Sequence, residues 1–396
     1  MTTAIPEPSV PSLPLLPTPE EKALRQTVTD IVTPFGHDYY MRASTTGEPM
    51  TELWQRLAAA GFLGLNIPEQ YGGSGAGLTQ LAIVLEELSA GGCPELAMVL
   101  SPGMAGSILA RHGNDEQRHR YLPAIADGTE KFVFALTEPD AGSNSYNIKT
   151  TARRDGDDWL IKGTKYYISG VDHCDHFLLV ARTGTDERNG RGELTLFVVE
   201  PDADGLTRSP LPTALRAPER QFTLFFDDVR VPSSAVVGEV GKGGVPLFDG
   251  LNPERVLSAV ICTGVGRYAI EKASRYARER NVWGVPIGTH QGVQHPLAAA
   301  AIEIEAARGM LWRAAALYDA GIPSGEASNM AKYLAANAGY RALDAAIQTH
   351  GGNGLADEYG LADLWSIVRL QKIAPVSTEM VLNHIAQHTL NLPRSY

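Results

Sequence analysis

The sequence predicts a multidomain α+β protein with an N-terminal α-helical domain, a middle β-barrel or β-sandwich domain and a C-terminal four-helix bundle. Three observations predict this order: helix-forming segments fill residues 18–130, short strands separated by turns fill residues 131–236, and long segments with apolar residues at helical spacing fill residues 237–396. A chain of 396 residues is long enough for two or three domains with cores of their own. Residues 1–17, which include several prolines, are expected to form a flexible arm.

The N-terminal domain shows clear helix signals. Thr18 is expected to cap the first helix, and Glu20 and Glu21 follow in its first turn, where carboxylates suit the helix dipole. The expected helices span residues 19–35, 52–60, 78–89, 94–112 and 116–125.

The middle region alternates apolar and polar residues at the spacing of strands. The turn Asp155-Gly156-Asp157 predicts a hairpin between two of these strands. The expected strands span residues 133–136, 148–154, 159–161, 166–169, 177–182, 194–200 and 222–226.

The C-terminal region contains four long segments with helical periodicity, which predict the bundle. Leu257, Ile261, Val265 and Tyr268 recur at the spacing of one helix face. The expected helices span residues 253–280, 292–320, 325–350 and 377–390.

Composition excludes several classes of protein. The net charge of −11 argues against general binding of nucleic acids or acidic membranes. Cys93, Cys174 and Cys262 are too scattered to form a disulfide framework and suit a reducing compartment. The N-terminus lacks the basic region of a signal or transit peptide, and no apolar run is long enough to span a bilayer. A cytoplasmic protein is therefore expected.

The run Asp172-His173-Cys174-Asp175-His176 contains every common type of metal ligand. Its spacing matches no standard zinc pattern, and it directly precedes an expected strand. No metal site is therefore predicted.

Hydroxyl groups gather at the ends of two expected strands. Thr137 and Ser143 follow the first strand of the middle region, and Tyr167 and Ser169 lie in another. Such groups can form hydrogen bonds with the edge of a polar, planar ring or with a phosphate. The pattern alone favours an ordinary hairpin with polar turns.

These strand ends resemble a known family. The run ALTEPDAGS, from Ala135, closely resembles the TEPxAGSD signature of the acyl-CoA dehydrogenase family, and KYYISG, from Lys165, resembles its K-x-W-I-T-N-G segment. The order of helices, strands and helices is similar to the family's architecture across nearly the whole chain. The resemblance implies FAD as the cofactor, and it implies as cofactor-binding residues Leu136, Thr137, Gly142, Ser143, Tyr167 and Ser169.

Glu254 is the candidate catalytic base. Asn252-Pro253-Glu254-Arg255 has the form of a helix start, with an Asn cap, a first-position proline and a first-turn acid. The other interpretation is catalytic, because α,β-dehydrogenation needs a carboxylate that takes the α-proton while hydride leaves the β-carbon. Some members of the family carry their base directly before this arginine. The resemblance implies that Asn252 and Arg255 bind substrate.

The family's more usual base lies in a Y-E-G-T segment near the C-terminus. Counted forward without gaps from Gln348, that segment falls on Ala374-Pro375-Val376-Ser377. Proline has neither a carboxyl group nor a backbone N–H. The family also uses that N–H to hold the thioester carbonyl, and losing such a donor commonly costs about 3–4 kcal/mol. A shift of one residue that brings Val376 into place would restore the donor, and the sequence leaves this open.

Three further segments resemble cofactor contacts of the family. Arg280-Asn281-Val282-Trp283-Gly284 resembles R-x-x-F-G, whose arginine meets the FAD pyrophosphate of a neighbouring subunit, and the resemblance continues through Gln291. The segment from Gln348 to Gly354 resembles Q-x-x-G-G-x-G. By residue type and spacing alone, the first two segments are also typical of a helix end, and Ser377 and Glu379 are typical of the N-cap and the first-turn acid of a helix. The cofactor-binding residues that the resemblance implies here are Arg280, Trp283, Gln291, Gln348, Gly352, Ser377 and Glu379.

The resemblance therefore implies FAD-dependent dehydrogenation of an acyl-CoA thioester to the trans-2-enoyl-CoA in fatty acid metabolism. It also implies transfer of electrons to an electron-transfer flavoprotein, and a homotetramer or dimer as the assembly. Two alternatives stay open on the sequence: a flavin-dependent monooxygenase of the same fold, and a non-catalytic subunit of a heteromeric acyl-CoA dehydrogenase. Pro375 is the residue that favours the second alternative.

Overall fold

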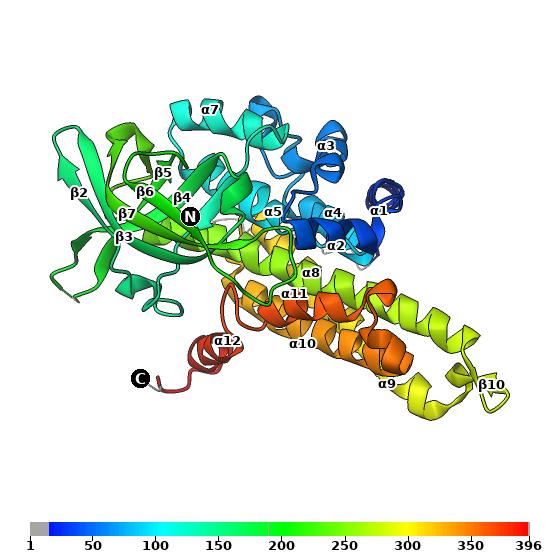
Figure 1. Ribbon diagram of the computed structural model, residues 1–396. Helices are drawn as coiled ribbons and strands as arrows, with labels where there is room; N and C mark the ends of the chain where they lie inside the picture. The colour runs from blue at the N-terminus through cyan, green and yellow to red at the C-terminus, as the bar shows by residue number, and fades with distance from the viewer. Residues whose placement is uncertain (1–15, 189, 395–396) are drawn as a thin grey trace, which may run out of the picture.

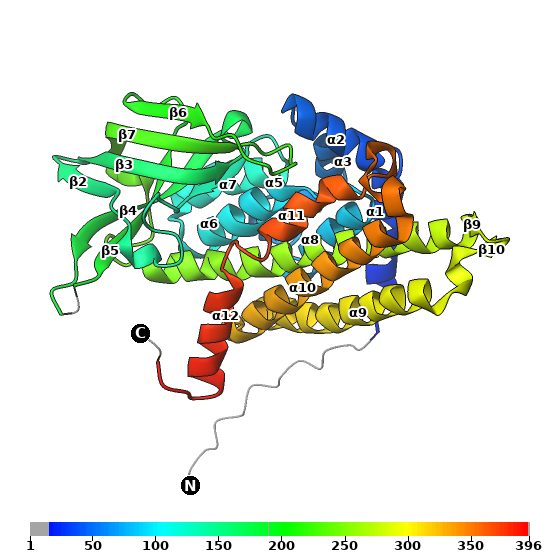
Figure 2. The ribbon, with the colours of Figure 1, turned by 60° about the horizontal axis from the view of Figure 1, so that its bottom comes forward.

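A computed structural model describes residues 16–188 and 190–394, so that residues 1–15 of the predicted flexible arm lie outside the described residues. The chain forms an N-terminal group of helices, a twisted β-sheet and a C-terminal group of long helices (Figure 1). The sheet lies at one end of the molecule, and the long helices extend away from it toward the opposite end (Figure 2).

The first helix begins at the N-cap that the sequence predicts. The hydroxyl of Thr18 accepts a hydrogen bond from the Glu21 N–H, and the Glu21 carboxylate accepts one from the Thr18 N–H. The predicted cap is thus confirmed as a capping box. The helices are α1 (Pro19–Val32), α2 (Gly36–Thr46), α3 (Thr51–Ala59), α4 (Leu78–Ala90), α5 (Leu96–Met98), a π-helical turn (Val99–Gly106), α6 (Ser107–His112) and α7 (Asp115–Ala126).

Two predictions in this region are wrong. Helix α2 was not expected, and no side-chain cap marks its start. The single helix predicted over residues 94–112 is three pieces, because Pro102 lies inside it. Proline cannot donate the backbone hydrogen bond of a regular helix, and the chain widens into a π-helical turn around it.

The middle region is one mixed, eight-stranded sheet. Its strands are β1 (Phe132–Ala135), β2 (Thr151–Asp155), β3 (Asp158–Ser169), β4 (His176–Thr185), β5 (Gly192–Val199), β6 (Leu206–Pro210), β7 (Gln221–Pro232) and β8 (Val236–Val237). They run in the order β6-β7-β3-β2-β4-β5-β8, and β1 pairs in parallel with β4. The predicted hairpin is confirmed, with Asp155 opposite Asp158.

Strand β3 corrects the prediction of two separate strands around Gly163. The strand is continuous but irregular at this point, where its register against β7 shifts. Gly163 has a φ of +153°, and a Cβ there would lie 2.5 Å from the Thr150 hydroxyl oxygen. Glycine therefore allows the close approach of β2 to β3, and the two predicted strands are one.

The C-terminal region contains α8 (Gly244–Glu279), β9 (Asn281–Val282), β10 (Val285–Pro286), α9 (Gln291–Asp319), α10 (Gly325–His350), α11 (Trp365–Leu370), α12 (Thr378–His384) and a π-helical turn (Ile385–Thr389). The fourth long helix predicted over residues 377–390 is thus the short α12 followed by a π-helical turn. Helix α11 was not predicted.

Helix α8 begins earlier than predicted, at Gly244 rather than at Pro253, so Asn252 is not its cap. The first part of α8 packs against α6, and a Cβ on Gly250 would lie 2.4 Å from Ile108. Leu247 and Pro253 are buried in this contact region. Tertiary packing therefore extends the helix beyond the point where the sequence signals a start.

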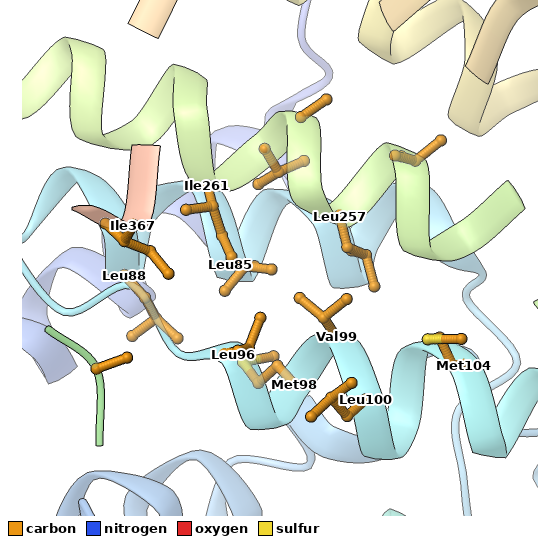
Figure 3. Close-up of a cluster of buried hydrophobic side chains, with 14 of the residues drawn as sticks. Leu85, Leu88, Leu96, Met98, Val99, Leu100, Met104, Leu257, Ile261 and Ile367 are labelled. Atoms are coloured by element: carbon orange, nitrogen blue, oxygen red, sulfur yellow. The ribbon is translucent and has the colours of Figure 1, made fainter. Parts of the chain in front are cut away.

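The middle of α8 forms the centre of the hydrophobic core. Leu257 and Ile261 project from α8 toward Val99 and Leu100 of the π-helical turn, and Leu85 of α4 lies beside them (Figure 3). A Cβ on Gly103 would lie 2.3 Å from Leu257, so the two helices are in close contact. None of the described helices is both long and apolar enough to cross a membrane.

A buried ionic network connects the N-terminal helices to the long C-terminal helices. The carboxylate of Glu86 on α4 is fully buried and contacts Arg25 at 2.7 Å, Arg308 at 2.9 Å and Arg267 at 3.4 Å. Thr263 of α8 donates a further hydrogen bond of 2.9 Å to it. Burial opposes the charged form, but the three guanidinium groups outweigh it, and the pKa of Glu86 is lowered.

We expect Glu86→Ala to lower the free energy of unfolding by about 3–5 kcal/mol, because it leaves three arginines around a partly buried site without their shared carboxylate. The matched control is Glu305→Ala, which removes an exposed partner of Arg308 and should change stability by less than about 1 kcal/mol. Urea unfolding followed by circular dichroism measures both. Equal losses for the two variants would contradict a structural role for the Glu86 network.

Candidate functional site

Glu254, the candidate base, lies on α8 next to the apolar core. Glu254 comes one helical turn before Leu257, whose side chain enters the cluster in Figure 3. Glu254 is half-buried, and among the described residues it forms no ion pair. Burial raises the pKa of the Glu254 carboxyl to about 7, although Arg255 and Lys332 act in the opposite direction. A carboxyl group with this pKa can take and hold a proton near neutral pH.

Two cations lie close to this carboxyl. Arg255 is buried and donates a hydrogen bond of 2.8 Å to the side-chain oxygen of Asn252. Lys332, on α10, is 1% exposed, and its ammonium donates a hydrogen bond to the backbone carbonyl of Val376. Burial lowers the pKa of Lys332 to about 8. The structure therefore brings together the predicted Asn252, Glu254 and Arg255.

Part of this neighbourhood has no polar partner within the described chain. The Nε of Arg255 and the side-chain oxygen of Asn329 on α10 are both buried without a hydrogen-bond partner among the described residues. Buried polar atoms usually have a partner, so a polar ligand or water molecules would satisfy these two.

The segment that leads into α12 lies beside Lys332. Ser377 caps α12, with its hydroxyl accepting a hydrogen bond of 3.3 Å from the Met380 N–H. Glu379 is exposed in the first turn, and its charge acts on Lys332. The capping role expected for Ser377 from its residue type is thus present.

The predicted cofactor residues of the middle region lie where the turn after β1 (residues 136–143) packs against the last part of β3 (residues 165–169), a place that we call the sheet edge although β3 is an inner strand. A fully buried ion pair joins Lys165 of β3 to Glu138 at 2.9 Å, and the same ammonium donates a 2.8 Å hydrogen bond to the carbonyl of Leu136. Glu138 also accepts hydrogen bonds from the backbone N–H groups of Lys149 and Thr150. This pair holds the turn after β1 against β3.

Further hydrogen bonds bring the two strand ends together. The Tyr166 N–H donates to the carbonyl of Thr137 at 2.8 Å, and the Gln221 side chain donates to the hydroxyl of Ser169 at 2.8 Å. Gly142 and Ser143 lie exposed in the turn. These hydrogen bonds place Thr137 beside Tyr166 and therefore bring the turn after β1 next to the strand that carries Tyr167 and Ser169.

Tyr167 has two unusual features. Its φ is +58°, and its side chain is 56% exposed. A positive φ is costly for a bulky residue, and such strain is found mainly at functional sites. The ring of Tyr167 is thus available to a planar ligand beside Ser169.

A second group of predicted cofactor residues lies elsewhere. Arg280 and Trp283 are at the β9–β10 connection, which lies at the opposite end of the molecule from the sheet (Figures 1 and 2). Trp283 also has a positive φ, +52°, and is 88% exposed. Gln348 is exposed near the end of α10, and nothing lies within 4 Å of a Cβ placed on Gly352. Gln291 begins α9. Within one chain, this second group therefore does not lie near the sheet edge.

The residues of the run Asp172–His176 contact mainly residues outside it, although His173 also lies 3.6 Å from Asp172. His173 contacts the carbonyl of Gly47, Asp172 pairs with Arg220, and His176 contacts Glu130 and Glu200. Among residues 16–188 and 190–394 there is no group of three or more His, Cys, Asp or Glu side chains arranged to hold a metal ion.

A small cavity of ≈ 30 Å³ near Gly170 is lined by two further buried acids, Glu95 and Glu219. Burial raises the pKa of both carboxyl groups. Glu219 accepts a hydrogen bond of 2.9 Å from the Ala97 N–H near the start of α5. These contacts connect α5 to the sheet, and the volume is suited to water molecules rather than to a large ligand.

Three buried residues beside the predicted site residues, Lys165, Glu138 and Lys332, were not predicted from the sequence. Lys332 occupies a position on the apolar stripe of the predicted helix over residues 325–350, between Ala331 and Ala335. A charged residue on a buried helix face needs a partner, and that signal was present in the sequence.

Comparisons with known proteins agree with this architecture. The chain matches the acyl-CoA dehydrogenase N-terminal domain over residues 18–129, the middle domain over residues 133–229 and the C-terminal domain over residues 242–390. It is 50% identical over 379 residues to acyl-CoA dehydrogenase FadE12 of Mycobacterium tuberculosis, covering 95% of this chain and 97% of that protein.

Two more distant relatives are similar to this chain over nearly its whole length. The chain is 31% identical to the probable acyl-CoA dehydrogenase YngJ of Bacillus subtilis, covering 94% of this chain and 98% of that protein. It superposes on the crystal structure of an acyl-CoA dehydrogenase from Geobacillus kaustophilus with a TM-score of 0.89 and 28% identity, covering 96% of this chain and 100% of that one. This chain therefore belongs to the acyl-CoA dehydrogenase family of FAD-dependent oxidoreductases.

Proposed function

We propose that this protein oxidises an acyl-CoA thioester to the trans-2-enoyl-CoA, with Glu254 as the base that removes the α-proton. One observation chiefly supports this role: Glu254 is a half-buried carboxyl next to an apolar cluster, it has no ion pair with any described residue, and burial raises its pKa to about 7. The ionised form of such a group is a stronger base than an ordinary glutamate, because burial leaves less water to stabilise its charge.

The neighbouring residues have complementary roles in this proposal. Arg255 and Asn252, joined by a hydrogen bond, would hold the thioester end of the substrate. The apolar side chains around Leu257 would exclude water from the reacting carbons and would contact the acyl group. Lys332 would keep part of the Glu254 population ionised at neutral pH through its charge.

FAD, when bound, supplies the acceptor for the hydride that leaves the β-carbon. Leu136, Thr137, Gly142, Ser143 and Ser169 would hold its polar groups at the sheet edge, and Tyr167 would pack against a ring. The exposed, strained Tyr167 and the converging hydroxyl groups fit a planar, polar cofactor.

The second group of cofactor residues supports an assembly of more than one copy. Arg280, Trp283, Gln291, Gln348 and Gly352 would complete the FAD site of another copy, because within one chain they lie far from the sheet edge (Figure 2). Ser377 and Glu379 would contact the same cofactor from α12. We propose a homotetramer, in which a dimer is the smallest unit that completes a site.

Membership of this family also supports a proposal for the compartment, the pathway class and the electron acceptor of the enzyme. We propose that the enzyme works in the cytoplasm in fatty acid metabolism and that an electron-transfer flavoprotein reoxidises it. Free cysteines at positions 93, 174 and 262 are consistent with a reducing compartment.

The first test is the variant Glu254→Gln, which removes the base while keeping the shape of the side chain. We expect flavin reduction by the best of a panel of butyryl-, isovaleryl-, octanoyl- and palmitoyl-CoA to slow by about 10²–10⁴-fold. Anaerobic stopped-flow absorbance measures the rate. Glu326→Gln, a matched change on the exposed first turn of α10, should keep the wild-type rate.

An unchanged rate in Glu254→Gln with a full complement of FAD would reject Glu254 as the base. A yellow wild-type protein that no thioester bleaches would reject dehydrogenation itself and would favour the monooxygenase or the partner-dependent subunit.

The second prediction concerns pH. Because Glu254 acts in its ionised form and its pKa is about 7, kcat/KM should rise as the pH increases through about 7 and should then level off. The dependence is measured with the wild-type enzyme and a saturating electron acceptor. A rate that stays constant across neutral pH would contradict the assignment.

The third prediction concerns retention of FAD. Lys165→Met leaves the buried Glu138 carboxylate without its cation and frees the turn that carries Leu136 and Thr137, so the variant should purify with much less FAD. Absorbance of the bound flavin relative to protein measures this. Lys149→Met, which removes an exposed ion pair with Asp140 at the same turn, should keep its FAD, and equal loss in both would refute a specific role for Lys165.

A further inference from the structure

We propose that Glu95 and Glu219 share one buried proton, and that this proton holds the end of strand β3 against helix α5. That end of β3 carries Tyr167 and Ser169. The proposed dehydrogenation uses neither acid. The effect on the cofactor rests on the proposed contacts of Tyr167 and Ser169 with FAD, whereas the shared proton itself does not depend on the reaction that the protein catalyses.

The first observation is the burial of both acids in one cavity. Glu95 is 4% exposed and Glu219 is 7% exposed, and both line the cavity of ≈ 30 Å³ near Gly170. Apolar residues such as Leu100 and Phe132 form much of the remaining wall. Two ionised carboxylates in this place would lose their water and would repel one another, so ionisation of both is unfavourable.

The second observation is a missing donor. The Ala97 N–H donates a hydrogen bond to Glu219 Oε1 at 2.9 Å, but the Oε2 atoms of Glu95 and Glu219 are buried without a donor among the N–H and O–H groups of the described residues. The two carboxyl groups form a side-chain hydrogen bond with one another. Ionised carboxylates are acceptors only, so such a bond requires a proton on one of them.

The third observation is that the neighbouring basic side chains have other partners. Lys131 acts on both carboxyl groups through its charge, but its ammonium lies over the ring of Trp54 at 4.3 Å. His173, which also lines the cavity, has its Nε2 at 2.8 Å from the carbonyl of Gly47. Within the described part of the chain, neither acid forms an ion pair. A proton is therefore the cation that this pair can share.

The remaining titratable groups around the pair stay uncharged near neutral pH, because burial raises the pKa of each. These groups are Tyr39 and Tyr40 of α2 and Cys93. They interact with the charge of Glu95, and Tyr40 also interacts with that of Glu219. None of them supplies a positive charge that would replace the proton.

The contacts distinguish the two acids. Burial raises the pKa of Glu95 well above its usual range, and the neighbouring Glu219 raises it further. Burial also raises the pKa of Glu219, but hydrogen bonds from the Ala97 N–H and from Glu95 act in the opposite direction. Glu95 therefore carries the proton and Glu219 accepts the hydrogen bond, and the two acids titrate as one unit.

Glu219 connects this proton to the end of β3. The Gly170 N–H donates to the carbonyl of Arg220 at 2.9 Å, and the Gln221 side chain donates to the hydroxyl of Ser169 at 2.8 Å. A Cβ on Gly170 would lie 3.7 Å from the Glu219 side chain, so the two segments are in contact. Loss of the proton would leave two like charges between α5 and this segment and would loosen the end of β3.

The pH dependence has a definite sign. The pKa of both acids is raised in the folded protein, so the folded state holds a proton that the unfolded chain releases. The stability that this proton contributes is therefore present at acidic pH and is lost as the pH rises above the ordinary pKa of glutamate and through the raised pKa of the pair.

The test compares the wild type with Glu95→Gln, whose amide keeps the shape of the protonated acid and cannot ionise. We expect this variant to unfold near the wild-type temperature at acidic pH and at a higher temperature than the wild type at alkaline pH, as measured by circular dichroism. The infrared difference spectrum between wild type and variant at neutral pH should contain the carbonyl band of a protonated carboxyl group, which an ionised carboxylate lacks.

The matched control is Glu48→Gln. It removes an exposed glutamate beside Pro49 and Met50, which line the same cavity. This variant should keep the wild-type pH dependence of unfolding and should give no such infrared band.

Retention of FAD tests the effect on the end of β3. After gel filtration at alkaline pH, the wild type and Glu48→Gln should lose more FAD than Glu95→Gln, whereas at neutral pH all three should retain it equally. Absorbance of the bound flavin relative to protein measures this.

Each outcome decides one part of the inference. Absence of the protonated carboxyl band, or a wild-type pH dependence of unfolding in Glu95→Gln, would overturn the shared proton. Equal alkaline loss of FAD in wild type and Glu95→Gln would overturn its role at the end of β3. Neither result bears on dehydrogenation, which the bleaching of the flavin by a thioester tests separately. Should Glu95→Gln fail to fold, Glu219→Gln removes the other acid while keeping an oxygen for the Ala97 N–H, and the same outcomes decide.

Discussion

Burial of charge along helix α8 is the constraint on which the rest of the structure depends. Glu86 lies against this helix and Glu254 lies on it, yet the pKa values of these two glutamates shift in opposite directions. Three arginines surround Glu86 and keep it ionised. Glu254 has no ion pair among the described residues, and burial raises its pKa to about 7. The first arrangement stabilises the fold, and the second gives a group that can exchange a proton.

The same contrast applies to the buried lysines. Lys165 pairs with Glu138 and thereby fixes the turn that carries Leu136. Lys332 has a backbone carbonyl as its partner, and its charge also acts on Glu254. Each lysine holds a segment of irregular chain in one orientation against a regular element. A site built from loops can be as precise as one built from helices when such buried cations fix the loops.

The two groups of predicted cofactor residues lie at opposite ends of the folded chain, and each group includes an aromatic residue on strained backbone. Tyr167 at the sheet edge and Trp283 at the β9–β10 connection both have a positive φ and an exposed ring. Exposed aromatic rings on strained backbone are costly in an isolated chain. In the proposed assembly, a cofactor shared between two copies would cover both rings.

The sequence by itself determined the order of helices, strands and helices, because apolar periodicity and local caps such as Thr18 act over a few residues. Through resemblance to a family it also predicted a base at Glu254 and a cofactor site at the strand ends. Only the tertiary structure decided where α8 begins, since packing against α6 keeps residues before Pro253 helical. Only the tertiary structure joined Lys332 to Val376 across 44 positions of sequence. The pKa of a buried group and the partner of a buried cation depend on contacts between distant segments, and no local pattern encodes them.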